Sequence, residues 1–150
     1  MPVPPIIMLL AFVVSWFILR KTPLGRKIYA VGGNEKVSFI AGIKIERVKI
    51  FVYAITGFFC ALAGAVLTSR LNSAQPTAGT GYELDAIAAV VLGGTSLSGG
   101  KGYITGTLVG VLIIGTLNNG LNILDVSSFY QQVVKGIVIL LAVLMDRKKA

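Results

Sequence analysis

Long apolar runs with almost no charge alternate with short polar segments along this chain. The runs cover residues 3–19, 50–69, 103–117 and 129–145. Each is close to the length of a helix that crosses a membrane, about 20 residues. Another segment, 84–97, has an apolar core too short to cross as one continuous helix. The pattern predicts a single all-α transmembrane domain over residues 1–150, a polytopic helical bundle of about five spans with one short or broken span.

The charged residues are few, at 13%, and the basic ones are clustered. Eight of the fourteen Lys and Arg residues lie between Arg20 and Lys49, and three more form a tail at 147–149. Lys and Arg beside apolar runs mark the cytoplasmic side, so the net charge of +8 indicates topology and not nucleic-acid binding. The loop at 20–47 and the C-terminus are therefore predicted to be cytoplasmic. That arrangement requires segment 84–97 to cross, and we expect that it does.

The chain lacks most side chains of enzyme chemistry. It has no histidine and only six Asp and Glu residues, which excludes zinc sites and Ser-His-Asp triads. A phosphate loop ending in Gly100 and Lys101 fails, because Thr95 replaces its first glycine and Gly102 replaces its hydroxyl residue. The single cysteine, Cys60, lies in an apolar run and is interpreted as a small buried hydrophobe. We therefore predict no enzyme activity, no metal and no cofactor in this chain.

The polar loop at 20–47 contains one organised piece at 34–43. An asparagine suited to N-capping precedes an acidic first turn, three apolar residues share one face, and a glycine can end the helix. In chain order these residues are Asn34, Glu35, Val37, Ile40, Ala41 and Gly42. The pattern predicts a short amphipathic helix outside the membrane, which is either an ordinary surface helix or one that docks on a partner.

Small residues recur every four positions in two places. Such a face lets another helix approach closely, so we interpret both as packing surfaces without chemistry. The first set is Gly57, Ala61 and Ala65, and the second is Gly102, Gly106 and Gly110.

Neutral amide side chains gather around the junction of the last two apolar runs. They are Asn118, Asn119, Asn122, Gln131 and Gln132. Amides donate and accept hydrogen bonds and suit a hydroxyl-rich solute, because they bind it less tightly than charges would. They also join neighbouring helices, and both interpretations stay open.

Lys135 is the one charge well inside an apolar run. It lies roughly 9 Å into the last predicted span at 1.5 Å per residue. A lysine stem can extend to the membrane interface from there, and we favour this interpretation over a cation that faces a solute path.

Four longer segments carry a resemblance to a known family. They read GRKIYAVGGNEKVSFIAGI, LNSAQPTAGTGYELDAIAAVVLGGTSLSGGKG, NNGLNIL and VVKGIVILLAVL. Together they resemble the permease subunits of bacterial ATP-binding-cassette importers for monosaccharides, over nearly the whole chain. Permeases of that family are about twice as long, so the chain resembles their C-terminal half only.

The resemblance implies a multi-pass inner-membrane subunit that moves a sugar, with ribose the expected one. The implied partners are cytoplasmic ATPase subunits that bind and hydrolyse ATP, a second permease subunit and an external sugar-binding protein. The helix at 34–43 would then be a coupling helix that sits in a groove of the ATPase. Contact with the binding protein would involve Asn72, Gln75, Thr80 and Tyr82. The sugar path would involve Asn118, Asn119, Asn122 and Lys135.

A function of another class also stays open. A small self-associating pore or a structural membrane protein would need only glycine-faced helices and no ATPase partner. Recovery of an ATPase in a mild-detergent pull-down distinguishes the two.

Overall fold

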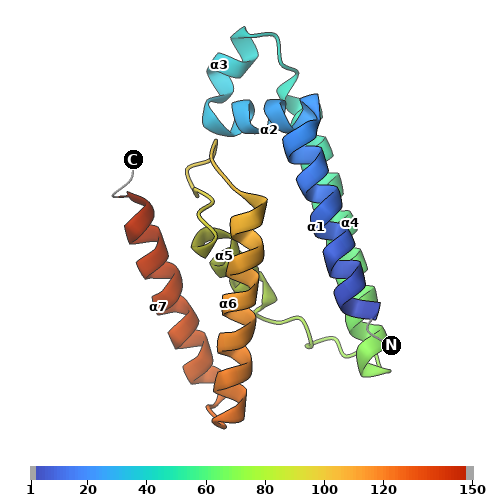
Figure 1. Ribbon diagram of the computed structural model, residues 1–150, viewed down its shortest axis with the longest axis vertical. Helices are drawn as coiled ribbons and strands as arrows, with labels where there is room; N and C mark the ends of the chain where they lie inside the picture. Colours follow the sequence, from blue (N-terminus) through green and yellow to red (C-terminus); the bar gives the residue numbers. More distant parts are fainter. Residues whose placement is uncertain (1–2, 148–150) are drawn as a thin grey trace. The chain divides into compact units, whose positions relative to one another are not determined.

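The computed structural model describes the backbone of residues 3–147 and the side chains in that range except at 128, 142 and 145–147. The described residues form helices joined by turns and irregular segments (Figure 1). The helices are α1 (Val3–Lys21), α2 (Pro23–Gly33), α3 (Glu35–Ile40), α4 (Ile45–Leu71), α5 (Tyr82–Leu92), α6 (Ile104–Ile123) and α7 (Ser128–Arg147). The predicted all-α bundle is confirmed. The tail residues Lys148 and Lys149 lie outside the described residues.

The chain divides into two compact units, Met1–Gly79 and Thr80–Ala150. In the first unit, α2 packs against α1, α3 and α4, and α3 also contacts α4. In the second unit, α5 packs against both α6 and α7. The central element of each unit is therefore a short helix with long apolar helices around it.

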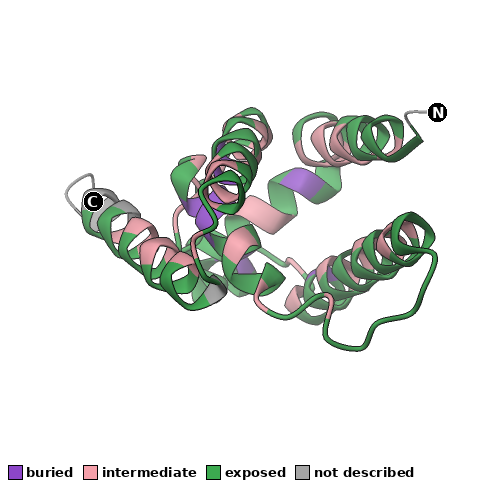
Figure 2. Ribbon diagram, turned by 90° about the horizontal axis from the view of Figure 1, so that it is seen from below, coloured by how far each residue is buried: buried purple, intermediate pink, exposed green. Residues whose placement is uncertain are grey.

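Among the residues that the structure describes, three helices, α1, α4 and α6, are long and apolar enough to cross a membrane. Most of their surface is exposed in the isolated chain, as Figure 2 shows, and α1 has no buried residue. Large apolar side chains such as Leu10, Phe17 and Phe58 are more than half exposed. Apolar surface of this extent suits lipid or neighbouring protein. Cys60 on α4 is exposed too, so the expectation of a buried thiol is wrong.

The polar loop at 20–47 is more ordered than its sequence pattern predicted, because it contains α2 in addition to α3. Thr22 caps α2 by accepting a hydrogen bond from the Gly25 amide at 3.4 Å. Pro23 occupies the first turn, where a backbone N–H would have no partner within the helix, so its missing N–H costs nothing. Gly25 is buried against the backbone of Leu19, where a Cβ would overlap the carbonyl oxygen. This close contact allows the chain to turn sharply from α1 into α2.

Helices α5 and α6 approach each other at small residues. A Cβ on Gly106 would overlap the carbonyl oxygen of Gly93, and a Cβ on Gly110 would overlap that of Ala89 and lie 2.9 Å from its carbonyl carbon. The two backbones are thus in direct contact. Gly102 precedes α6 instead of lying on its face, and a Cβ there would meet the Thr95 side chain at 3.0 Å. By contrast, a Cβ on Gly57 of α4 would have nothing within 4 Å.

Helix α5 runs antiparallel to α6 and is short. Its later residues pair with earlier ones of α6, since Gly93 meets Gly106 and Ala89 meets Gly110. With 11 residues, α5 is about 16 Å long at 1.5 Å per residue, against roughly 30 Å of bilayer hydrocarbon. The short or broken span that the sequence predicts is thus a short helix followed by an irregular segment, 93–103, that leads into α6.

Candidate functional site

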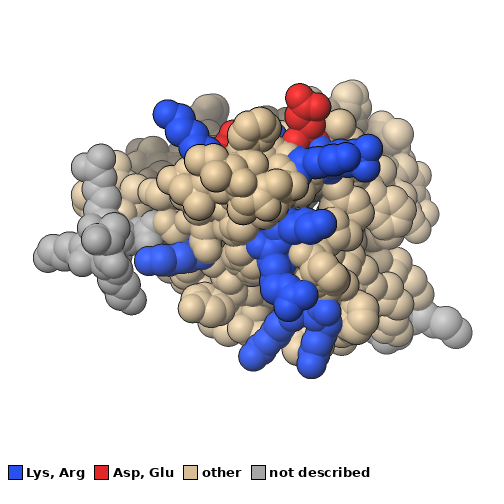
Figure 3. Space-filling view, turned by 90° about the horizontal axis from the view of Figure 1, so that it is seen from above, with Lys and Arg blue, Asp and Glu red and all other residues tan. Residues whose placement is uncertain are grey.

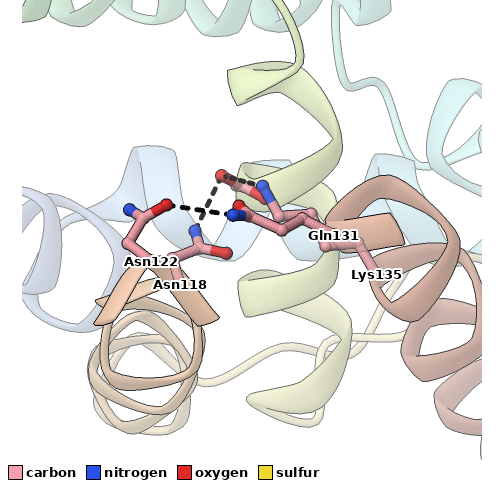
Figure 4. A network of polar contacts seen from close by, with 5 residues as sticks. Asn118, Asn122, Gln131 and Lys135 are labelled. Atoms are coloured by element: carbon pink, nitrogen blue, oxygen red, sulfur yellow. Dashed lines mark hydrogen bonds and ion pairs between the residues drawn. The ribbon is translucent and has the colours of Figure 1, made fainter. Parts of the chain in front are cut away.

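A polar cluster joins the three helices of the second unit (Figure 4). The Asp85 carboxylate of α5 contacts the Lys135 ammonium of α7, with Oδ1 2.7 Å and Oδ2 3.0 Å from Nζ. Asn118 of α6 donates from Nδ2 to Oδ2 of Asp85 at 3.0 Å. The Lys135 and Asp85 side chains are only 13% and 18% exposed. We call these three residues the polar cluster.

The sequence positions the polar cluster through helical spacing. On α5, Asp85 is one turn before the buried Ala88 and Ala89, so its carboxylate lies on the face that meets α6. On α6, Asn118 is one turn beyond the buried Ile114. Val138 and Ile139 of α7, one turn beyond Lys135, pack on the same small apolar core.

The charges in the cluster cancel, but one of its hydrogen-bond acceptors has no partner among the described residues. Asp85 and Lys135 neutralise each other, which is the condition under which ions are tolerated in a membrane interior. The Oδ1 atom of Asn118 is buried and accepts no hydrogen bond from the described residues. Buried polar atoms without a partner are rare in native proteins, so the expected partner of this acceptor is a water, a ligand or another protein segment.

A second pair of amides lies nearer the turn between α6 and α7. Gln131 donates from Nε2 to Oδ1 of Asn122 at 3.0 Å and to the carbonyl oxygen of Val126 at 2.8 Å. These two hydrogen bonds hold the start of α7 to the end of α6 and to the turn between them. Asn119 and Gln132 are exposed.

The structure corrects the interpretation of Lys135 and adds a residue that the sequence did not single out. Lys135 does not extend away from the bundle to the interface, because its ammonium is held by Asp85. A cation inside an apolar run calls for a nearby anion, and this was the signal available for pairing the two.

The other candidate surface is α3 with its surroundings. Asn34 caps the helix by accepting from the Val37 amide at 3.1 Å, and Gly42 follows it with a φ of +81°, so the predicted cap and end are confirmed. Glu35 forms an ion pair with Lys49 of α4 at 2.7 Å. Val37 and Ile40 are 61% and 84% exposed.

Further features define this surface. Ala41, directly after α3, is exposed, whereas Ser38 of α3 is buried. Phe39 and residues 42–47 line an open hollow beside the helix. Lys and Arg side chains gather on the face shown in Figure 3. Helix α3 thus presents apolar residues to the outside while its other side holds it to the unit.

The residues expected to contact a binding protein lie on both sides of the division between units. Asn72 and Gln75 belong to the first unit, and Thr80 and Tyr82 belong to the second. All four are exposed, and Asn72 ends α4 in the left-handed conformation with a φ of 51°. Ala61 and Ala65, which share the face of Gly57 on α4, are exposed as well.

The chain belongs to a family of membrane transport permeases. Residues 2–143 match the family described as the permease component of branched-chain amino acid transport systems. The ribose import permease protein of Bacillus subtilis is 72% identical over 149 residues, which cover 99% of this chain and 46% of that protein. The ribose import permease protein of Escherichia coli K12 is 62% identical over 148 residues, with 99% and 46% covered.

A relative with another named substrate is more distant. The xylose transport system permease protein of Escherichia coli K12 is 46% identical over 145 residues, which cover 97% of this chain and 37% of that protein. The chain spans less than half the length of these curated relatives. No solved structure matches it.

Proposed function

We propose that this chain forms part of the membrane permease of an ATP-driven sugar importer and that its substrate is ribose. The identity of 72% and 62% to two ribose import permeases, over nearly the whole chain, is the observation that carries the proposal. The greater distance to the xylose permease, at 46%, favours ribose over xylose. The partners of such an importer are cytoplasmic ATPase subunits, a second permease subunit and an external binding protein that delivers the sugar.

The sugar path runs past the polar cluster and the nearby amides. Asn118, Asn119 and Asn122 offer neutral donors and acceptors, which suit the hydroxyl groups of a sugar. Lys135 contributes no net charge to this path, because Asp85 balances it. A charge-neutral path suits a neutral substrate.

Coupling to ATP hydrolysis enters through α3. Its exposed Val37 and Ile40 suit a hydrophobic groove on an ATPase subunit, the helix-in-groove mode of recognition. The ion pair between Glu35 and Lys49 connects α3 to the start of α4. Movement of the groove would therefore shift a helix that crosses the membrane.

The test is a hybrid permease, in which these 150 residues replace the matching segment of the Bacillus subtilis ribose import permease protein. A strain without its own ribose permease should regain ribose uptake when it expresses the hybrid. A pull-down in mild detergent should recover the ATPase subunit. A hybrid that is inserted in the membrane but takes up no ribose contradicts the proposal, and absence of the ATPase would favour a self-associating pore.

Replacing both Val37 and Ile40 by Asp in the hybrid should lower ribose uptake at least about tenfold. The protein should still accumulate in the membrane. Both side chains are mostly exposed, so the change removes little packing within the chain but places charge in the contact with the ATPase. Uptake and ATPase recovery are measured together. Lys36→Gln on the same helix is the matched control, and normal uptake by the double variant would remove the coupling role of α3.

Helix α3 and the loop after α4 should lie on opposite sides of the membrane. In a hybrid whose Cys60 and other cysteines are replaced by serine, single cysteines at Lys36 and Gln75 should react from inside and outside respectively with a reagent that cannot cross the membrane. We expect this because the loop before α4 is basic, which favours the cytoplasmic side, and because α4, with 27 residues, is long enough to cross the membrane. A third cysteine at Lys148 should react from inside, like Lys36. Labelling of Lys148 from outside would contradict the crossing of segment 84–97.

A further inference from the structure

We propose that Asp85 is a positioning residue that fixes the orientation of the Asn118 amide. The Oδ1 atom of Asn118, which this orientation leaves available, accepts a hydrogen bond from a hydroxyl group of the transported sugar. This inference rests on the proposed function, because it requires the sugar path to pass the polar cluster. It assigns different tasks to the three residues of the cluster.

The orientation of the Asn118 amide follows from the chemistry of its neighbour. An ionised carboxylate only accepts hydrogen bonds, whereas an amide presents a donor at one end and an acceptor at the other. With Oδ2 of Asp85 at 3.0 Å, the donor Nδ2 must face it, because the reverse orientation would bring two oxygens together. Asp85 thereby determines that Oδ1 is the end available to another molecule.

The Oδ1 atom of Asn118 is an unused acceptor inside the bundle. It is buried and receives no hydrogen bond from the described residues. Leaving a buried acceptor unsatisfied is costly, and a hydroxyl that arrives when the path opens would satisfy it. Asn122, one turn further along α6, already accepts from Gln131, so its acceptor has a partner.

The third member, Lys135, keeps the site neutral. Its Nζ lies 2.7 and 3.0 Å from the two carboxylate oxygens of Asp85, so the ammonium is engaged and the carboxylate is balanced. An unbalanced carboxylate would attract cations, and an unbalanced ammonium would hold anions. A neutral pair that orients an amide fits a neutral polyhydroxyl substrate.

The experiment uses the hybrid permease reconstituted in liposomes with the ATPase subunit and ribose-loaded binding protein. The quantities measured are the ATPase rate and the ribose moved per ATP hydrolysed. The variant Asp85→Ala/Lys135→Leu removes both charges together, so no ion is left unpaired and the complex should assemble. Its ATPase rate should stay within about twofold of the unchanged hybrid, whereas ribose moved per ATP should fall about fivefold, the order expected for one hydrogen bond.

Two comparisons make this result specific. Asn118→Leu removes the acceptor itself and should lower the ratio at least as far, and combining all three substitutions should lower it no further than Asn118→Leu alone, because both changes act through the same contact. Glu83→Gln, an exposed carboxylate in the same turn as Asp85, should leave the ratio unchanged. A purely structural cluster would lower assembly and ATPase rate but would not change the ratio.

The outcomes separate the two proposals. If the unchanged hybrid moves no ribose, the proposed function fails. If it moves ribose and the double variant keeps the same ratio, the positioning role of Asp85 is overturned. Should the double variant not accumulate, Asp85→Asn/Lys135→Met preserves the shape while allowing either amide orientation, and about a twofold fall in the ratio is expected. If neither accumulates, the pair is structural and the positioning role is again overturned.

Discussion

Asp85→Ala alone should strongly destabilise the hybrid permease. It leaves the Lys135 ammonium, only 13% exposed, without its counter-ion and removes the acceptor of the Asn118 amide. Removing one member of a buried ion pair costs about 3–5 kcal/mol, which is comparable to a large part of the stability of many domains. The expected result is a sharp loss of folded protein from the membrane and a lower thermal transition in mild detergent.

Two variants test whether the unpaired charge is the cause. Asp85→Ala/Lys135→Leu should recover most of the folded protein, because replacing both ions by apolar groups is often close to neutral. Glu83→Ala removes an exposed carboxylate from the same helical turn and should have little effect. Equal losses for Asp85→Ala and Glu83→Ala would show that the ion pair does not hold α5 to α7.

Gly110→Ala and Gly115→Ala should change stability in opposite directions, although they add the same methyl group to the same helix. At Gly110 the methyl would overlap the Ala89 carbonyl oxygen and lie 3.2 Å from the Gly93 amide nitrogen, both backbone atoms that cannot move independently of α5. Forcing the helices apart should cost about 1–3 kcal/mol or more. At Gly115 nothing lies within 4 Å, and alanine should stabilise the helix by up to about 1 kcal/mol.

The measurement is the thermal transition of both variants in the same detergent and lipid. Gly106→Ala should behave like Gly110→Ala, since its methyl would overlap the carbonyl oxygen of Gly93. A transition raised by both Gly110→Ala and Gly115→Ala would mean that α5 and α6 are not in backbone contact in the membrane.

The sequence predicts best those features that depend on neighbours along the chain. The Asn34 cap and the end of α3 at Gly42 follow from local hydrogen bonding and backbone freedom, and both are present in the structure. The start of α2 at Thr22 and Pro23 has a similar local signal that our interpretation overlooked. Helix α4 begins at Ile45, before the apolar run at residue 50, because charged residues can continue a helix beyond the membrane.

The polar cluster is harder to predict because its members are far apart in sequence. Asp85 and Lys135 are separated by 50 positions, and Asp85 and Asn118 by 33. Hydropathy identifies each apolar run but does not specify which faces meet. The glycines of α6 carry part of that information, since backbone contact with α5 sets the register that brings Asp85 beside Asn118. The small residues on α4 have the same spacing, yet a Cβ on Gly57 would have nothing within 4 Å, so spacing alone does not reveal whether a contacting helix is present.

The scarcity of interior packing has a consequence for how such a chain is made in a cell. Among the described residues, the buried apolar side chains are Val31, Val48, Ala88, Ala89, Val91 and Ile114. So small an interior gives the isolated chain little to hold its helices together while the ribosome is still at work. Newly inserted copies should depend on prompt packing against further helices, and those that remain alone should be the ones that membrane proteases remove.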